Sequence, residues 1–175
     1  MADSPVYRAT EVASAYDGID CLPVVVLLDQ VRSLYNVGSF FRTCDAVRAT
    51  KIVLAGITAA PPNPKIAKTA LGAERTVQWE KSDDPLLSVD ALRRAGCQVA
   101  AIETSLRAVD LFDWQPEFPV CVVFGHEVEG IRPELLAVCD VHVRIPTLGL
   151  KQSINVATAG GVVLYELLRK YRRLA

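Results

Sequence analysis

The sequence predicts an α/β fold in which a mostly parallel sheet is flanked by helices. Short apolar runs of strand length alternate with segments in which apolar residues recur at helical spacing. Most of the short runs are apolar throughout, as expected for strands buried on both faces of a parallel sheet. The 175 residues fit a single domain, and 51% hydrophobic with 22% charged residues is typical of a globular protein.

The first quarter of the chain predicts two strands joined by a helix. Residues 1–20 form a short N-terminal extension with a helix over Tyr7–Tyr16. Val24–Leu28 is an apolar run typical of a buried strand. A helix is expected to open at Asn36, because the apolar residues that follow recur at helical spacing. They are Val37, Phe40, Phe41, Cys44 and Val47. Lys51–Ala55 is the second strand.

The next stretch is richer in proline and predicts shorter elements. A loop over Gly56–Pro64 leads into a short helix over Ile66–Leu71. Thr76–Trp79 has the pattern of a short strand. Asp84 is a helix cap, and Pro85 suits the first helical position, where no amide N–H is needed.

The second half of the chain repeats the alternation. Its predicted elements are a strand over Gln98–Ile102, a polar loop over 103–118, a strand over Val120–Phe124, a helix over Pro133–Val138, a strand over Val141–Ile145 and a helix from Ser153 to about Arg173. The Ser153 hydroxyl is expected to cap that last helix. Ligands bind beyond the carboxyl ends of parallel strands, so the site is expected at the turns after Leu28, Ile102, Phe124 and Ile145.

Composition limits the partners and the compartment. With a net charge of −1, a nucleic-acid partner would have to be held by a local basic patch. Five cysteines without a CxxC pair argue against a disulfide framework and a zinc site, and favour buried free thiols. No apolar run is long enough to span a membrane, and the N-terminus lacks a signal-peptide pattern, so a cytoplasmic protein is expected.

The first candidate motif is Asn36-Val-Gly38-Ser-Phe-Phe-Arg42. It places an arginine in an otherwise apolar helix, where a buried guanidinium would need a carboxylate or a phosphate as partner. A structural pair with Asp29 or Asp45 is the simpler interpretation of this motif alone.

The second motif, Phe124-Gly125-His126-Glu127-Val-Glu-Gly130, follows a strand with a glycine-bracketed turn. Glycines would let a planar ligand lie against bare backbone. Glu127 could bind a donor or cap a helix, and His126 is interpreted as a turn residue. No GxGxxG occurs, so a Rossmann dinucleotide site is not supported.

The third motif joins Ile145-Pro146 to Ser153-Ile154-Asn155-Val156 across a loop. By itself it predicts only a strand, a loop and a capped helix.

In this order and at these spacings, the three motifs resemble the SpoU (TrmH-type) branch of the SPOUT RNA methyltransferases. The resemblance runs from about Val24 to Leu168. The segment Thr69-Ala-Leu-Gly72-Ala-Glu74, followed by Trp79-Glu80, is also similar to the family's middle region.

The resemblance implies a single domain over residues 1–175 with a C-terminal trefoil knot that binds S-adenosylmethionine, without a metal. The implied cofactor contacts are Thr104, Gly125, Glu127, Ile145, Ser153 and Ile154. The implied reaction methylates a ribose 2′-hydroxyl of tRNA or rRNA in a homodimer. Arg42 matches the family's catalytic arginine, and Asn36, Glu127, Ser153 and Asn155 match its polar helpers.

RNA binding is expected to use local basic residues: Arg42, Lys65, Lys68, Arg75 and Lys151, with a tail of Arg169, Lys170, Arg172 and Arg173. The tail is equally well interpreted as a solvated helix end. An accessory protein could help to recognise the RNA. Three alternatives remain open at this point: a base-directed SPOUT methyltransferase, a catalytically idle RNA-binding or assembly protein on the same fold, and a small-molecule α/β enzyme.

Overall fold

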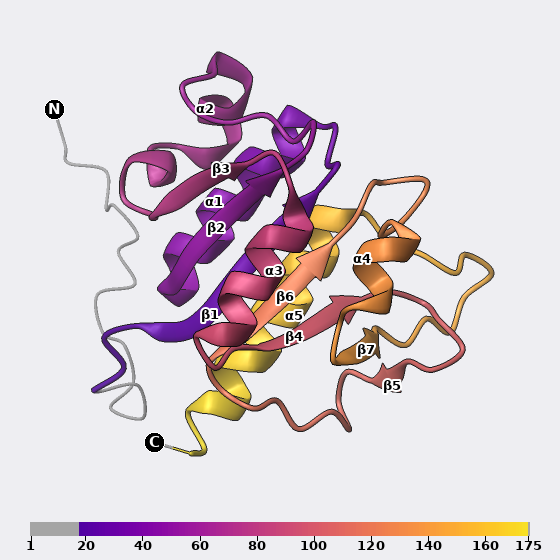
Figure 1. The fold of residues 1–175 in the computed structure, drawn as a ribbon. Coiled ribbons are helices and arrows are strands. Elements are labelled where there is room, and N and C mark those ends of the chain that lie inside the picture. The colour runs from indigo at the N-terminus through magenta and orange to yellow at the C-terminus, as the bar shows by residue number, and fades with distance from the viewer. Residues whose placement is uncertain (1–17, 175) are drawn as a thin grey trace, which may run out of the picture.

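A seven-stranded parallel sheet forms the centre of the molecule (Figure 1). The computed structural model describes residues 18–174, and the helix expected over Tyr7–Tyr16 lies outside them. The strands are β1 (Leu22–Asp29), β2 (Ala49–Ala55), β3 (Trp79–Ser82), β4 (Gln98–Ile102), β5 (Val109–Asp110), β6 (Val120–Phe124) and β7 (Val141–Arg144), in the order β3-β2-β1-β6-β4-β7-β5. Every neighbouring pair among these strands runs parallel, which confirms the predicted fold class.

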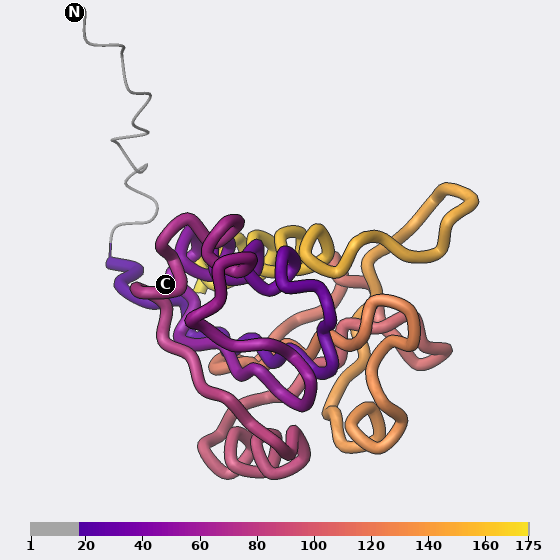
Figure 2. Tube along the Cα trace, turned by 90° about the horizontal axis from the view of Figure 1, so that it is seen from above, coloured from indigo at the N-terminus to yellow at the C-terminus, as the bar shows by residue number. Residues whose placement is uncertain are grey.

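Helices cover both faces of this sheet (Figures 1 and 2). They are α1 (Leu34–Val47), α2 (Pro64–Ala70), the 3-10 helix η2 (Ala73–Arg75), α3 (Pro85–Arg94), α4 (Pro133–Ala137) and α5 (Val156–Tyr171). Side chains alternate along β1, so Val24 and Val26 join the core under α1, α2 and α5, whereas Val25 and Leu27 join the core under α3 and α4. None of the described helices is long and apolar enough to cross a membrane.

Strand register brings the carboxyl ends of the central strands to one edge. Leu28 of β1 pairs with Phe124 of β6, and Ile102 of β4 pairs with Val143 of β7. The turns after these strands therefore meet, although they are far apart in the sequence. The loop between β7 and α5 extends beyond this edge and away from the body of the protein (Figure 2).

Three helices begin at other residues than expected. Helix α2 begins at Pro64 rather than Ile66, because the Asn63 side chain caps it by accepting from the Lys65 amide. Helix α1 begins at Leu34, where the Ser33 hydroxyl accepts a hydrogen bond from the Asn36 amide, so Asn36 lies within the first turn. Helix α5 begins at Val156, and its cap is Asn155 rather than Ser153. The Asn155 side chain accepts from two amides, whereas Ser153 lies further out in the exposed loop.

Two strand predictions were also wrong. The strand expected over Thr76–Trp79 runs over Trp79–Ser82, because the Thr76 hydroxyl bonds to Asp45 and Ala73 at the end of η2. The segment 103–118, expected to be a loop, contains β5 at the edge of the sheet. Of the five cysteines, Cys44, Cys97 and Cys121 are buried as expected, whereas Cys139 is half-buried and Cys21 is exposed.

Close packing of α1 on α2 depends on Gly38. A Cβ at this position would lie 2.1 Å from Thr69 Oγ1 and 2.3 Å from the Ile66 carbonyl oxygen. We expect Gly38→Ala to lower the free energy of unfolding by about 1 to 3 kcal/mol, because backbone would have to move. Urea unfolding followed by circular dichroism measures this.

Gly161→Ala is the matched control, because a Cβ at Gly161 of α5 meets nothing within 4 Å. It should raise the free energy of unfolding by up to about 1 kcal/mol, since alanine favours the helix. Equal effects of the two substitutions would contradict the packing argument.

Candidate functional site

The carboxylate of Glu127 joins the turn after β6 to the N-terminus of α1. Its Oε1 accepts hydrogen bonds from the Ser33 amide at 3.0 Å and from Asn36 Nδ2 at 3.0 Å. Its Oε2 accepts from the Arg32 amide at 3.1 Å. Glu127 therefore pairs the amide of Ser33, the N-cap residue, which the helix leaves without a partner, and the amide of the residue before it.

Asn36 connects this carboxylate to the start of α5. Its Oδ1 accepts a hydrogen bond from Asn155 Nδ2 at 3.2 Å. The Oδ1 of Asn155 accepts from the amides of Ala157 and Thr158 at 2.9 and 3.2 Å. One chain of hydrogen bonds thus links a residue from each of the three sequence motifs.

The environment of Glu127 keeps its carboxylate ionised. Burial alone would raise the pKa of Glu127, but hydrogen bonds from the Ser33 and Arg32 amides and from Asn36 outweigh burial and lower this pKa. The positive end of the α1 dipole favours the same ionised form.

A cavity of about 720 Å³ lies beside this network, beyond the carboxyl ends of β4, β6 and β7. The six residues implied as cofactor contacts, Thr104, Gly125, Glu127, Ile145, Ser153 and Ile154, all line it. Asn155 lines it as well, whereas Asn36 and Arg42 do not. The turn after β1, also expected at the site, does not line the cavity and contributes instead the amides that bind Glu127.

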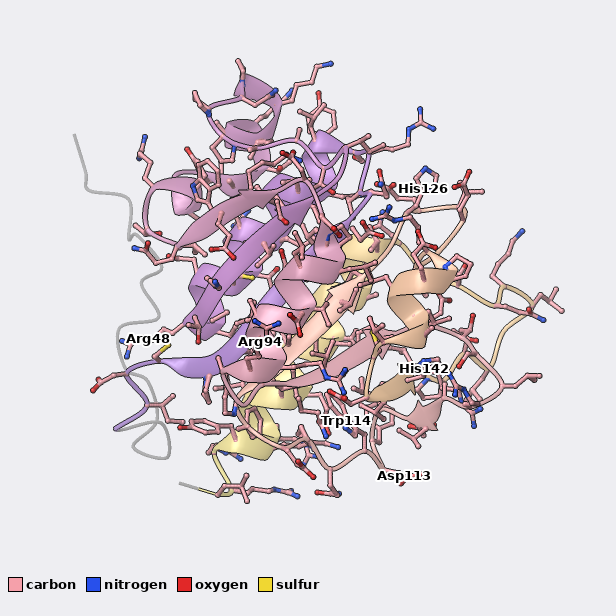
Figure 3. The ribbon with its side chains drawn as sticks, in the orientation of Figure 1. Arg48, Arg94, Asp113, Trp114, His126 and His142 are labelled. Carbon is pink, nitrogen blue, oxygen red and sulfur yellow. The ribbon has the colours of Figure 1, made fainter. Side chains whose placement is uncertain are left out.

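The turn after β6 is shaped by close backbone contacts. A Cβ at Gly125 would lie 2.3 Å from the carbonyl carbon of Gly130, so only glycine fits there. His126 is a turn residue, as predicted: its Nδ1 accepts from the amides of Val128 and Glu129, both at 3.1 Å. Figure 3 shows its side chain at this turn.

Glu103 is a cavity residue that the motif analysis missed. It follows β4 directly, and its two carboxylate oxygens accept from the amides of Thr104 at 2.9 Å and Ile131 at 3.1 Å. It therefore ties together two turns that line the cavity. An acidic residue immediately after a predicted strand was the available signal.

Both structural pairs considered for Arg42 were wrong. Asp29 is fully buried and forms a two-point ion pair with Arg132, at 2.8 and 2.9 Å. Asp45 accepts from the Thr76 hydroxyl. Arg42 is exposed on α1 and has no hydrogen bond or ion pair within residues 18–174. Its guanidinium is free to bind an external anion.

The other basic residues expected to bind RNA divide into two groups. Lys65, Lys68, Arg75 and Lys151 are exposed and have no carboxylate partner in the described part of the chain. In the tail, Arg169 pairs with Glu166, and Lys170 is buried and donates to the carbonyls of Leu111, Phe112 and Trp114. Lys170 therefore holds the turn after β5 and does not face solvent.

The SpoU rRNA Methylase family model matches residues 23–165. The chain is 31% identical over 148 residues to the tRNA (guanosine(18)-2′-O)-methyltransferase of Aquifex aeolicus (strain VF5), covering 84% of this chain and 69% of that protein. It is 32% identical over 163 residues to the 23S rRNA (guanosine-2′-O-)-methyltransferase RlmB of Burkholderia sp, covering 93% and 66%. The chain thus spans about two thirds of the length of these relatives.

Two solved structures show the same fold. The A. aeolicus TrmH/SpoU tRNA modifying enzyme superposes with a TM-score of 0.80 at 27% identity, over 87% of this chain and 77% of that chain. The SpoU methyltransferase AviRb from Streptomyces viridochromogenes, in complex with the cofactor AdoMet, superposes with a TM-score of 0.77 at 28% identity, over 84% and 57%.

The Glu127 contacts predict a pH-dependent contribution to stability. Glu127→Gln should lower the free energy of unfolding at pH 7 by about 1 kcal/mol, because a charged acceptor is lost from a site that is partly open to solvent. Since the pKa of Glu127 is lowered from its ordinary value of 4.5, the stabilisation is complete above that value. It disappears as the pH falls through the lowered pKa in the folded state.

Urea unfolding of both proteins from pH 7 down to pH 3 measures this difference. Glu129→Gln is the control, since Glu129 is exposed in the same turn and its carboxylate accepts no hydrogen bond within residues 18–174. A difference for Glu127→Gln that stays constant below pH 4 would contradict the assignment.

Proposed function

The chain belongs to the SpoU rRNA Methylase family, and from this premise we propose that it transfers a methyl group from S-adenosylmethionine to a ribose 2′-hydroxyl of RNA. The observation that carries the proposal is the hydrogen-bonded chain from Glu127 through Asn36 to Asn155 beside the cavity. The 2′-O-methyltransferase activities for which the tRNA and rRNA relatives are named support it.

The cavity fits S-adenosylmethionine in size and in chemistry. Its volume of about 720 Å³ lies in the range of small-molecule sites. Ile145 and Ile154 supply apolar surface for the adenine ring, and Thr104 and Ser153 supply hydroxyls for the polar groups. The carboxylate of Glu103 favours a cationic ligand in the same space. The bound cofactor supplies an electrophilic methyl group on its sulfonium.

Arg42 is assigned to the RNA rather than to the cofactor. Methyl transfer requires alignment of the 2′-oxygen with the methyl group and removal of the hydroxyl proton. A guanidinium does not give up its proton readily, so Arg42 is a poor base. We assign it to the phosphate next to the target ribose and to the negative charge that develops on the 2′-oxygen. Its exposed, unpaired guanidinium supports this role.

The polar network holds the reacting region in place. The ionised Glu127 fixes Asn36, and Asn36 fixes Asn155 next to the cavity. In this proposal Asn36, Glu127 and Asn155 orient the ribose relative to the cofactor, and the exposed Ser153 hydroxyl adds a donor or acceptor at the rim.

We propose that two copies form the working enzyme through the outer surfaces of α1 and α5. These helices pack against one another, and their exposed residues include Tyr35 and Tyr165. Arg42 lies on α1 but does not line the cavity of its own subunit. A second copy placed against these helices would bring Arg42 to a complete site.

Further parts of the proposal rest on family membership. Residues 1–175 form one methyltransferase domain, with 1–20 as a short extension, and the segment carrying the second and third motifs forms a trefoil knot. Lys65, Lys68, Arg75 and Lys151 bind RNA, an accessory protein assists recognition, and the reaction takes place in the cytoplasm.

Arg42→Ala should lower kcat/KM for RNA methylation by at least about 100-fold, since a preorganised charge at the oxyanion is lost. Arg42→Lys should lower it by at least about tenfold, because a point charge does not replace the planar fork. The assay follows labelled methyl from S-adenosylmethionine into unmodified total RNA, which is then size-fractionated and digested to nucleosides.

Arg94→Ala is the control for charge, because Arg94 pairs with Asp90 on α3, on the other face of the sheet. Label in a base, rather than in 2′-O-methylribose, would identify a base-directed methyltransferase and refute the proposed reaction. Near-normal activity of Arg42→Lys would refute the role of Arg42.

A further inference from the structure

A second groove, of about 510 Å³, lies on α2, η2 and β3 and shares no lining residue with the cavity described above. Its walls include the rings of Pro61, Pro62 and Pro64, which precede and open α2. Trp79, the first residue of β3, lines it as well. This combination makes the surface of the groove mostly apolar.

Trp79 offers an aromatic surface in this groove. The side chain is half-buried: part of it packs against the core beneath α1 and α2, and part lines the groove. Its fixed indole and the neighbouring proline rings suit a flat, apolar ligand such as an unstacked nucleobase.

One unpaired cation lines the groove, and two more lie on the helix that forms one of its walls. Arg75 lines the groove, and the exposed Lys65 and Lys68 follow its lining residues Pro64 and Ala67 in α2. None of the three has a carboxylate partner within residues 18–174. On α3, by contrast, Arg93 pairs with Asp140 and Arg94 with Asp90. The charge around the groove is therefore available to a polyanion.

One carboxylate lines the groove, and it limits how a nucleotide can lie. The Oε2 of Glu74 accepts from the Gly72 amide at 3.0 Å, and its Oε1 has no partner in the described part of the chain. A carboxylate repels a phosphate but accepts a hydrogen bond from the N–H groups of a base. A nucleotide in this groove would therefore place its base toward Glu74 and its phosphate toward the lysines.

We propose that this groove binds an unpaired nucleotide of the substrate RNA, at a position other than the methylated one. The base stacks on Trp79, and Arg75, Lys65 and Lys68 bind the adjoining phosphates. The proposal rests on the proposed function in taking RNA as the substrate.

The groove is coupled to the helix that carries Arg42. The Thr69 hydroxyl of α2 donates to the Tyr35 carbonyl of α1 at 3.0 Å, and Gly38 allows the two helices to touch. An RNA strand held in the groove would leave it next to α1. The groove would thus set the register of the RNA relative to Arg42.

The test uses the intrinsic fluorescence of the full chain, which has two tryptophans. Trp114 is buried, so quenching by RNA reports on Trp79 (Figure 3). A short mixed-sequence single-stranded RNA should quench the emission, and a fully paired RNA duplex should not, because its bases remain stacked. Trp79→Phe should abolish the quenching.

Affinity for the same single-stranded RNA, labelled with fluorescein, is measured by anisotropy. Trp79→Leu should weaken binding about tenfold. Arg75→Gln, at an exposed position, should weaken binding and reduce the slope of log affinity against log salt by about 0.7. Arg94→Gln should change neither quantity. Binding of S-adenosylmethionine, measured by calorimetry, should be unchanged in all variants and shows that each is folded.

Unchanged RNA affinity in both Trp79→Leu and Arg75→Gln would overturn the proposal, as would RNA binding without quenching. A variant that loses self-association while keeping RNA affinity would assign the groove to a protein contact and overturn it too. If RNA binding depends on the groove but no methyl is transferred, the proposed reaction is refuted and the proposed nucleotide site is retained. If methyl transfer is normal and the variants bind RNA normally, only the proposed nucleotide site is refuted.

Discussion

The hydrogen bonds that Glu127 accepts at the N-terminus of α1 are the interaction on which the rest of the site depends. They join the turn after β6 to a helix more than ninety residues earlier in the chain, through the Arg32 and Ser33 amides. Because Glu127 also accepts from Asn36 Nδ2, the side-chain oxygen Oδ1 of Asn36 is oriented to accept from Asn155, at the start of α5. Each group satisfies the next, so the positions of the three motifs are not independent.

Close packing of backbone makes this network possible. The turn after β6 can fold back on itself because Gly125 has no Cβ to meet Gly130. The ion pair between the fully buried Asp29 and the half-buried Arg132 ties the end of β1 to the residues that follow the turn. A fully buried aspartate without this partner would be costly, so the pair fixes the end of β1 relative to the segment that follows the turn.

The positions of the five strands β1, β2, β4, β6 and β7 could be predicted from the sequence because their apolar runs are long enough to recognise, and the cavity followed from the carboxyl ends of three of them. The edge strands β3 and β5 could not, because β3 is partly exposed and β5 has only two residues. The cap of α5 could not be predicted from the sequence, since serine and asparagine are both good N-caps. Only the hydrogen bond to the distant Asn36 distinguishes Asn155 from Ser153. Arg42 was predicted to be buried because its neighbours in the sequence are apolar, but its own position on α1 is exposed. The burial of Lys170 depends on carbonyls near residue 111, which no local pattern indicates.

The surfaces of this protein differ in whether their basic side chains are paired with carboxylates, and the net charge does not reveal this difference. With a net charge of −1, the molecule as a whole does not attract a polyanion. On α3 the arginines are neutralised by Asp90 and Asp140, and in α5 Glu166 neutralises Arg169. On α1 and α2, Arg42 and Lys68 have no such partner within residues 18–174. Under the proposed function, the RNA is therefore directed to the face where α1 and α2 lie side by side, the same face on which a second subunit would bring Arg42 to the cavity.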